Sequence, residues 1–221
     1  MRNVFVIGLG NFGYHLAIRL EGRARVTAVD VDRARIQKVG SVVARAIVGD
    51  GSNPDLLKEL GVEAADVAVV SVGDSMEQSI LITHQLKELR VPEIYAKAVS
   101  ESHARILELI GATRVLQPER EVAENLAISL AKTTIVDYLQ LHRTFGIIEV
   151  TAPPPFHGKS LAELKLRSRF RVSVVGIFRG QDRLVNPGPD TIIRPGDRMV
   201  VLGTSDDVLV FEEKALAAEK A

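Results

Sequence analysis

The stretch Val4-Phe5-Val6-Ile7-Gly8-Leu9-Gly10-Asn11-Phe12-Gly13 decides the fold of this chain. Its first four residues are an uninterrupted β-branched and aromatic run, which is typical of a strand buried on both faces of a parallel sheet. Three glycines follow with Gly-x-Gly-x-x-Gly spacing: Gly8 permits a tight turn, Gly10 lets the backbone approach a diphosphate, and Gly13 lets a helix pack closely on the strand. The pattern predicts a strand, a turn and a helix whose free N–H groups face an anion.

Two further features favour a nucleotide-binding turn over a turn that merely joins a strand to a helix. Phe12, Leu16 and Leu20 recur at helical spacing, so the predicted helix has an apolar face. The next apolar run, residues 26–29, ends at Asp30, 20 residues after Gly10. A carboxylate at this position is suited to hydrogen-bond a ribose diol.

Composition limits the classes of function. The 221 residues include 28 basic and 28 acidic side chains, so no net charge attracts nucleic acid or an anionic membrane. The absence of cysteine excludes disulfides and thiolate chemistry. No apolar run approaches the ~18 residues of a membrane span, and a first strand that begins at residue 4 leaves no room for a signal peptide. We therefore expect a cytoplasmic protein that does not bind nucleic acid.

Strand and helix patterns alternate regularly through the first half of the chain. Apolar runs predict further strands at 44–48, 67–72, 94–98 and 115–116. Capping residues and apolar stripes predict helices between the strands, at 32–39, 53–60, 75–89 and 100–110. Six strands alternating with five helices predict an α/β fold with a Rossmann-like, doubly wound, parallel six-stranded sheet.

The chain changes character at Glu121. Val122, Leu126 and Leu130 form an apolar helical stripe, and a second apolar series follows at 135, 136, 139 and 141. We expect helices over 121–143. The stripe packs either on the chain's own sheet or on another subunit, and both interpretations are open from the residues alone.

Residues 144–221 no longer repeat the strand–helix unit. Strands are expected at 146–150, 172–178, 184–185 and 199–202, and helices at 160–166 and 206–218. These elements predict a small α+β lobe that buries little core and needs a partner surface. The expected organisation is a nucleotide-binding lobe at 1–120, crossover and dimerisation helices at 121–143, and a C-terminal lobe at 144–221.

Catalytic groups are not evident. None of the five histidines sits beside a carboxylate or lysine in an acid–base pattern, and no Gly-x-Ser-x-Gly, His-Glu-x-x-His or Walker sequence occurs. His15 and His103 fall on expected helices, where a polar-face or partner-contact role is the usual one. Arg167, Arg169 and Arg171 indicate a solvated strand edge. The leading hypothesis is therefore a nucleotide-binding protein that is not an enzyme.

The alternative is an NAD-dependent oxidoreductase with a small C-terminal substrate lobe. It requires a titratable residue in the second half that faces the nicotinamide, and the sequence offers none. Asp30 also argues against a bound 2′-phosphate, and so against NADP.

Several short motifs follow one another in a recognisable order. They are Gly8-Leu9-Gly10-Asn11-Phe12-Gly13, Ala28-Val29-Asp30, Gly49-Asp50-Gly51-Ser52, Ser71-Val72-Gly73, Tyr95-Ala96-Lys97-Ala98, Gly111-Ala112, Gln117-Pro118-Glu119, Ile192-Ile193-Arg194-Pro195-Gly196-Asp197 and Val201-Leu202-Gly203. With this order and spacing, residues 1–140 resemble the RCK (regulator of K⁺ conductance) domain. The whole chain is similar to the cytosolic regulatory subunit of the Ktr/Trk family of potassium uptake systems.

The resemblance implies a bound adenine nucleotide, either ATP or ADP or NAD(H). The implied contact residues are Gly8, Gly10, Asn11, Phe12, Gly13, Asp30, Asp50, Ser71, Val72 and Lys97. Asp30 takes the ribose, Asp50 and Ser71-Val72 border the adenosine, and Lys97 approaches the phosphates. Glu119 corresponds to a family carboxylate that helps to hold a divalent cation, Mg²⁺ or Ca²⁺, at the dimer interface.

The resemblance also implies an assembly. It implies homodimers joined through helices after the sixth strand, arranged in a higher ring, expected to be an octamer, beneath a membrane potassium transporter. It favours packing of the stripe after Glu121 on another subunit. Some relatives also bind a cyclic dinucleotide in the C-terminal lobe. We expect a protein that lies peripheral to the membrane through its transporter partner and gates that transporter.

Asn11 departs from the family pattern. Members that sense ATP against ADP often have arginine directly after the second glycine, where it reaches a phosphate of the neighbouring subunit's nucleotide. A neutral amide loses a charge-assisted hydrogen bond worth about 1.5–3 kcal/mol. ATP preference is therefore open, and ADP or NAD(H) competes for the site.

Overall fold

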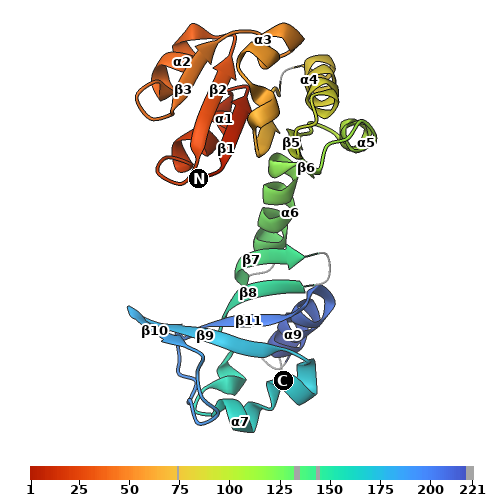
Figure 1. The fold of residues 1–221 in the computed structure, drawn as a ribbon. Helices are drawn as coiled ribbons and strands as arrows, with labels where there is room; N and C mark the ends of the chain where they lie inside the picture. The colour runs from red at the N-terminus through yellow and green to blue at the C-terminus, as the bar shows by residue number, and fades with distance from the viewer. Residues whose placement is uncertain (74, 132–134, 143–144, 218–221) are drawn as a thin grey trace. The chain divides into compact units, whose positions relative to one another are not determined.

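The structure, a computed structural model, describes residues 1–73, 75–131, 135–142 and 145–217. The chain divides into two compact units, Met1–Pro118 and Glu119–Ala221 (Figure 1).

The first unit alternates strands with helices. Its elements are β1 (Asn3–Ile7), α1 (Asn11–Arg19), β2 (Arg25–Asp30), α2 (Arg33–Val39), β3 (Arg45–Val48), α3 (Pro54–Glu59), the 3₁₀ turn η1 (Val62–Ala64), β4 (Val67–Val70), α4 (Met76–Glu88), β5 (Glu93–Lys97), α5 (Glu101–Leu109) and β6 (Arg114–Leu116). The six strands pair in parallel in the order β3-β2-β1-β4-β5-β6. The predicted doubly wound parallel sheet is confirmed.

The central strand β1 explains why the sheet is covered on both faces. Successive strand residues point to opposite faces, and Phe5 and Ile7 belong to one buried apolar cluster while Val4 and Val6 belong to another. The first cluster includes Ile82 of α4, and the second includes Ile36 of α2. An uninterrupted apolar strand therefore has a core on each side.

Local capping places the loops at the carboxyl edge of this sheet. The side chains of Asp32, Asn53, Ser75 and Ser100 accept backbone N–H groups in the first turns of α2, α3, α4 and α5. Each helix thus begins just after the end of a strand. In a doubly wound sheet this edge is where ligands bind.

The second unit is a small α+β lobe, as predicted. Its elements are α6 (Pro118–Ala131), β7 (Ile135–His142), β8 (Phe145–Thr151), the 3₁₀ turn η2 (Pro154–Phe156), α7 (Leu161–Leu164), α8 (Leu166–Phe170), β9 (Ser173–Arg179), β10 (Asp182–Val185), β11 (Arg198–Thr204) and α9 (Ser205–Ala217). The five strands form an antiparallel sheet in the order β10-β9-β11-β8-β7. Ile148, Ile177, Met199 and Phe211 are among its buried core residues.

Two sequence-based expectations in this unit are wrong. Residues 135–142, expected to be helical, form strand β7, which pairs with β8; its β-branched start, Ile135-Val136, favours a strand over a helix. Arg167 and Arg169, expected at a strand edge, lie on the short helix α8. Lys165 and Arg171 bound that helix with left-handed φ values of 49° and 60°, so the chain turns before β9 begins.

The apolar stripe of α6 is exposed. Val122, Leu126 and Leu130 are 65%, 53% and 78% accessible. Side chains of this size and spacing are normally covered by another helix or sheet. Among the described residues, no helix is long and apolar enough to cross a membrane.

Candidate functional site

One pocket of about 320 Å³ lies at the carboxyl edge of the parallel sheet. Its lining comes from β1, β2, β5, α1, α2, α4 and the loops after β1, β2, β3 and β4. The lining residues are Ile7, Gly8, Gly10, Asn11, Phe12, Val29, Asp30, Val31, Arg35, Gly49, Asp50, Gly51, Ser71, Val72, Gly73, Gln78, Ile82 and Lys97. The structure thus brings together every nucleotide-contact residue expected from the sequence except Gly13, which packs behind the turn.

The three glycines of the turn differ in what surrounds them. Gly8 has a φ of +92°, and a Cβ there would lie 2.8 Å from the carbonyl carbon of Ser71. A Cβ on Gly13 would lie 2.0 Å from the Gly8 oxygen, so the helix start leaves no room for a side chain. A Cβ on Gly10 would meet no atom within 4 Å. The open space above Gly10, beside the first N–H groups of α1, fits an anionic group close to the backbone.

Asp30 ties two loops of the pocket together. Its carboxylate accepts the Leu9 N–H at 2.5 Å through Oδ2 and the Asp32 N–H at 2.8 Å through Oδ1. The side chain is only 4% exposed. Because a carboxylate has about four acceptor positions, Asp30 can hold the glycine turn and still accept a ribose hydroxyl. The sequence did not predict this positioning role.

Two cations line the pocket. Arg35 places Nη1 3.7 Å from Asp30 Oδ2 and Nε 3.5 Å from Asp32 Oδ2. Lys97 ends β5, and its Nζ lies 3.7 Å from the position of a Cβ on Gly73. Arg35 was not predicted from the sequence; its signal is a basic residue on the first turn of the helix that follows the acidic strand end.

Polar groups of two further loops complete the lining. Asp50 Oδ1 accepts hydrogen bonds from the Ser52 N–H at 2.8 Å and the Ser52 hydroxyl at 2.7 Å. The Ser71 hydroxyl is buried and has no hydrogen-bond partner among the described residues. A buried hydroxyl without a partner is costly, and one in a pocket lining fits a site that a polar ligand completes. Gln78, on the first turn of α4, also lines the pocket and was not predicted from the sequence.

Glu119 does not join this pocket. It lies on the first turn of α6 together with Glu121, in the second unit. Among the described residues there is no group of three or more histidine or acidic side chains that could hold a metal ion. The described part of one chain therefore does not supply a complete ligand set around Glu119.

The two helical histidines differ in their surroundings. His15 is exposed on α1 and makes an edge contact with the Tyr14 ring. His103 is fully buried, so the expected polar-face role is wrong for it. Its Nδ1 accepts the Val99 N–H at 3.3 Å, its Nε2 has no partner among the described residues, and burial lowers its pKa below the ordinary 6.5.

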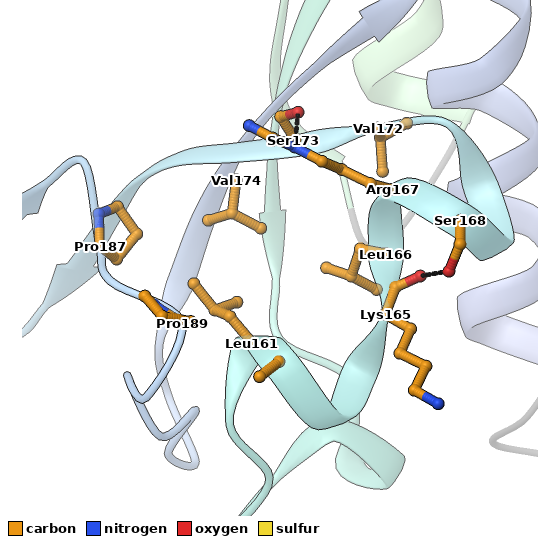
Figure 2. Close-up of a pocket in the computed structure, with 11 residues that line it drawn as sticks. Leu161, Lys165, Leu166, Arg167, Ser168, Val172, Ser173, Val174, Pro187 and Pro189 are labelled. Atoms are coloured by element: carbon orange, nitrogen blue, oxygen red, sulfur yellow. Dashed lines mark hydrogen bonds between the residues drawn. The ribbon is translucent and has the colours of Figure 1, made fainter.

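A second cavity, of about 420 Å³, lies in the C-terminal lobe (Figure 2). Figure 2 shows an apolar wall made by Leu161, Val174, Pro187 and Pro189. At the other side, Arg167 Nε donates a hydrogen bond to the Ser173 hydroxyl at 3.0 Å. The cavity therefore combines an apolar surface with a guanidinium held in place.

Comparison with known proteins places the chain in a family. The TrkA-N domain model matches residues 4–118, and the TrkA-C domain model matches residues 145–216. The sequence is 32% identical, over 212 residues, to the Ktr system potassium uptake protein C of Bacillus subtilis, with 96% of each chain covered. The chain belongs to the Ktr/Trk potassium uptake protein family.

A second relative supports this assignment, and a solved structure shares the fold. Ktr system potassium uptake protein A of Bacillus subtilis is 30% identical over 212 residues, again covering 96% of each chain. The crystal structure of the GsuK RCK domain has a similar fold, with a TM-score of 0.52 at 24% identity, and the match covers 98% of this chain and 47% of that one. The Ktr/Trk resemblance inferred from the motifs is confirmed.

Proposed function

We propose that this Ktr/Trk-family chain is a regulatory subunit that binds an adenine nucleotide and thereby gates a membrane potassium transporter from the cytoplasmic side. The observation that carries the proposal is the open space above Gly10, which adjoins the α1 N-terminus and the Asp30 carboxylate. Family membership over 96% of the chain supports the connection to potassium uptake.

The pocket suggests how the nucleotide lies. The diphosphate would sit over Gly10 at the start of α1, where backbone N–H groups point outward. The ribose would bond to Asp30, and the base would lie towards Asp50 at the end of β3. Asn11 offers a neutral amide to the phosphates, so ATP, ADP and NAD(H) are all candidate ligands.

The proposal assigns the pocket a binding role. Its lining includes the acidic and basic side chains of Asp30, Asp50, Arg35 and Lys97, which can bond the ribose, base and phosphates of a nucleotide. Asp30 is engaged by two backbone N–H groups. A nucleotide would act here by favouring one conformation of the protein, and the required coupling free energy is typically ~1–3 kcal/mol.

Assembly is part of the proposal. The exposed stripe Val122, Leu126 and Leu130 of α6 supports a homodimer in which a second copy covers this helix. Such dimers would build the ring, an octamer, that acts on the transporter. A divalent cation beside Glu119 would require ligands from the second copy, since the described residues of one chain gather no complete set.

A second ligand site is proposed in the C-terminal lobe. The cavity of Figure 2 pairs apolar side chains with the positioned Arg167 guanidinium. This combination suits a ligand with flat rings and a phosphate, such as a cyclic dinucleotide. Arg167→Gln should abolish binding of such a ligand while the exposed neighbour variant Arg169→Gln should not; equal loss in both would remove Arg167 from the site.

Native mass spectrometry of the purified full chain, followed by calorimetric titration with ATP, ADP and NADH, tests the main proposal. We expect a co-purified or added adenine nucleotide on an oligomer of even subunit number, and a ligand-dependent change of ring shape in solution scattering. Equal affinities for all three nucleotides, with no change in scattering, would contradict nucleotide gating.

A further inference from the structure

The loop between β3 and α3 forms one wall of the nucleotide pocket. Gly49, Asp50 and Gly51 line the pocket from this loop. A Cβ on Gly51 would lie 2.3 Å from Ile7 Cγ2 and 3.7 Å from Ile82 Cδ1. The loop therefore packs directly against β1 and α4.

Within the loop, the carboxylate of Asp50 is oriented by Ser52. Asp50 Oδ1 accepts both the N–H and the hydroxyl of Ser52. None of the hydrogen bonds found among the described residues uses Asp50 Oδ2. The position of Ser52 therefore determines where Asp50 presents its remaining acceptor oxygen.

Gln85 of α4 holds Ser52 from outside the loop. Its Nε2 donates a hydrogen bond to the Ser52 carbonyl oxygen at 2.8 Å, across 33 residues of sequence. A carbonyl oxygen only accepts, so the amide nitrogen must face it. The Gln85 Oε1 is then buried without a partner among the described residues. An unpaired buried carbonyl oxygen destabilises the fold, so packing alone would favour an apolar side chain at position 85. The hydrogen bond from Gln85 to the Ser52 carbonyl offsets this cost.

We infer that Gln85 is a positioning residue of the nucleotide pocket. Through Ser52 it fixes the Asp50 carboxylate, which selects the base of the bound nucleotide. The inference rests on the proposed adenine-nucleotide site. The inferred contact is at position 6 of the base, where adenine offers an amino group that donates to a carboxylate and guanine presents a carbonyl oxygen. Gln85 thereby supports selection of adenine over guanine without touching the ligand.

Calorimetric titration of the full chain with ADP and with GDP tests this role. In Gln85→Met, which keeps the side-chain length but removes the donor, the ADP affinity should fall about tenfold while the GDP affinity stays unchanged. The ratio of ADP to GDP affinity should fall by the same factor. Gln85→Glu, examined above pH 7, should behave in the same way and serves as a second variant if the first does not fold.

Thr83→Val is the matched control. Thr83 is buried on the same helix and donates a hydrogen bond to the Ser79 carbonyl at 2.8 Å. This variant should leave the ratio of ADP to GDP affinity as in the wild type. An unchanged ratio in both Gln85 variants would overturn the inference, as would an equal loss of ADP and GDP affinity, which indicates a merely structural role.

Hydrogen exchange in the ligand-free chain separates this inference from the proposed function. Gln85→Met should speed exchange of the Ser52 and Asn53 amides, which bond to Asp50, and leave the Gly8 amide unchanged. Unchanged exchange at Ser52 and Asn53 would overturn the positioning role. If the wild-type chain binds neither ADP nor GDP, the proposed function and the selection of the base both fail. Hydrogen exchange at Ser52 and Asn53 then decides by itself whether Gln85 positions the loop between β3 and α3.

Discussion

Asp30 has two roles: it is the proposed ribose contact, and it stabilises the glycine turn. Its carboxylate is the proposed partner of the ribose, and in the structure it accepts the N–H of Leu9 within the glycine turn. A charge-assisted hydrogen bond of this kind stabilises by about 1.5–3 kcal/mol. The conformation of the turn that would hold the diphosphate and the binding of the ribose therefore both depend on the Asp30 side chain.

Asp30→Ala should consequently lower both nucleotide affinity and thermal stability, without unfolding the chain at 25 °C. Asp30→Asn retains an acceptor oxygen, so we expect a smaller loss of both. Calorimetry with ADP and a thermal melt of each variant provide the measurements. An ADP affinity that is unchanged in a folded Asp30→Ala protein would remove Asp30 from the site.

His103 makes stability depend on pH. Burial lowers its pKa in the folded state, so the unfolded chain takes up a proton first as the pH falls through about 6.5. The contribution of neutral His103 is thus complete above that pH and is lost below it. The free energy of unfolding should decline between pH 7 and 5.5 in the wild type.

His103→Leu should flatten this decline, while His15→Gln, at an exposed site, should follow the wild type. Chemical denaturation at a series of pH values supplies the comparison. If the free energy of unfolding falls equally with pH in the wild type and in His103→Leu, His103 does not cause the pH dependence.

At the scale of the elements, local signals predicted most of the first unit. Apolar runs identified β1 to β6, and Asn53 and Ser75 cap the helices for which they were expected. The glycine spacing and the distance to Asp30 predicted the turn and the acidic strand end because both depend on backbone geometry near one strand end, whereas Asp50, Ser71, Val72 and Lys97 were expected only from the family resemblance. Arg35 and Gln85 were not predicted, since their roles come from contacts made only when α2 and α4 pack.

The second unit was harder to predict for a physical reason. Its helices α7 and α8 have four and five residues, too few for helical periodicity to be evident. Residues 135–142 carry apolar side chains at spacings that fit either a helix or a strand. The β-branched Ile135-Val136 is a weak local signal for a strand, and pairing with β8, which is distant information, stabilises that strand.

The ion pair between Arg179 and Asp197 holds two strands of this unit together. Arg179, the last residue of β9, donates two hydrogen bonds of 2.8 Å to Asp197, which precedes β11 and is completely buried. Asp197 also accepts the Arg194 N–H at 2.8 Å. The Arg179 guanidinium holds the pKa of Asp197 below its ordinary value of 3.8.

Asp197→Asn should destabilise the second unit by about 3 kcal/mol, because it leaves a largely buried guanidinium without its counterion. The wild-type pair stabilises above about pH 4 and loses this contribution as the pH falls further, so the variant should be less sensitive to acid. Arg120→Met, which breaks the exposed pair with Glu124, should cost less than about 1 kcal/mol. Urea denaturation at pH 7 and pH 3.5 measures the free energy of unfolding of each variant. Equal losses of this free energy in the two variants would contradict a larger contribution from the buried Arg179–Asp197 pair.

At the scale of the whole molecule, the two units have separate apolar cores. A ligand that binds only the first unit should stabilise only that unit. At an ADP concentration 100 times the dissociation constant the gain is about 2.7 kcal/mol. Differential scanning calorimetry should therefore show two transitions, of which ADP raises one; an equal shift of both would contradict a nucleotide site confined to the first unit.

The central claim is that the glycine turn binds the diphosphate of an adenine nucleotide, and Gly10→Val tests it most directly. Gly10 has a φ of −59°, and a Cβ there meets no atom within 4 Å, so the variant should fold and melt like the wild type. The new side chain would fill the space assigned to the diphosphate. Calorimetric titration of the full chain with ADP should show an affinity at least about tenfold lower than that of the wild type, a loss of about 1.4 kcal/mol or more. A folded Gly10→Val protein that binds ADP as tightly as the wild type would contradict the account.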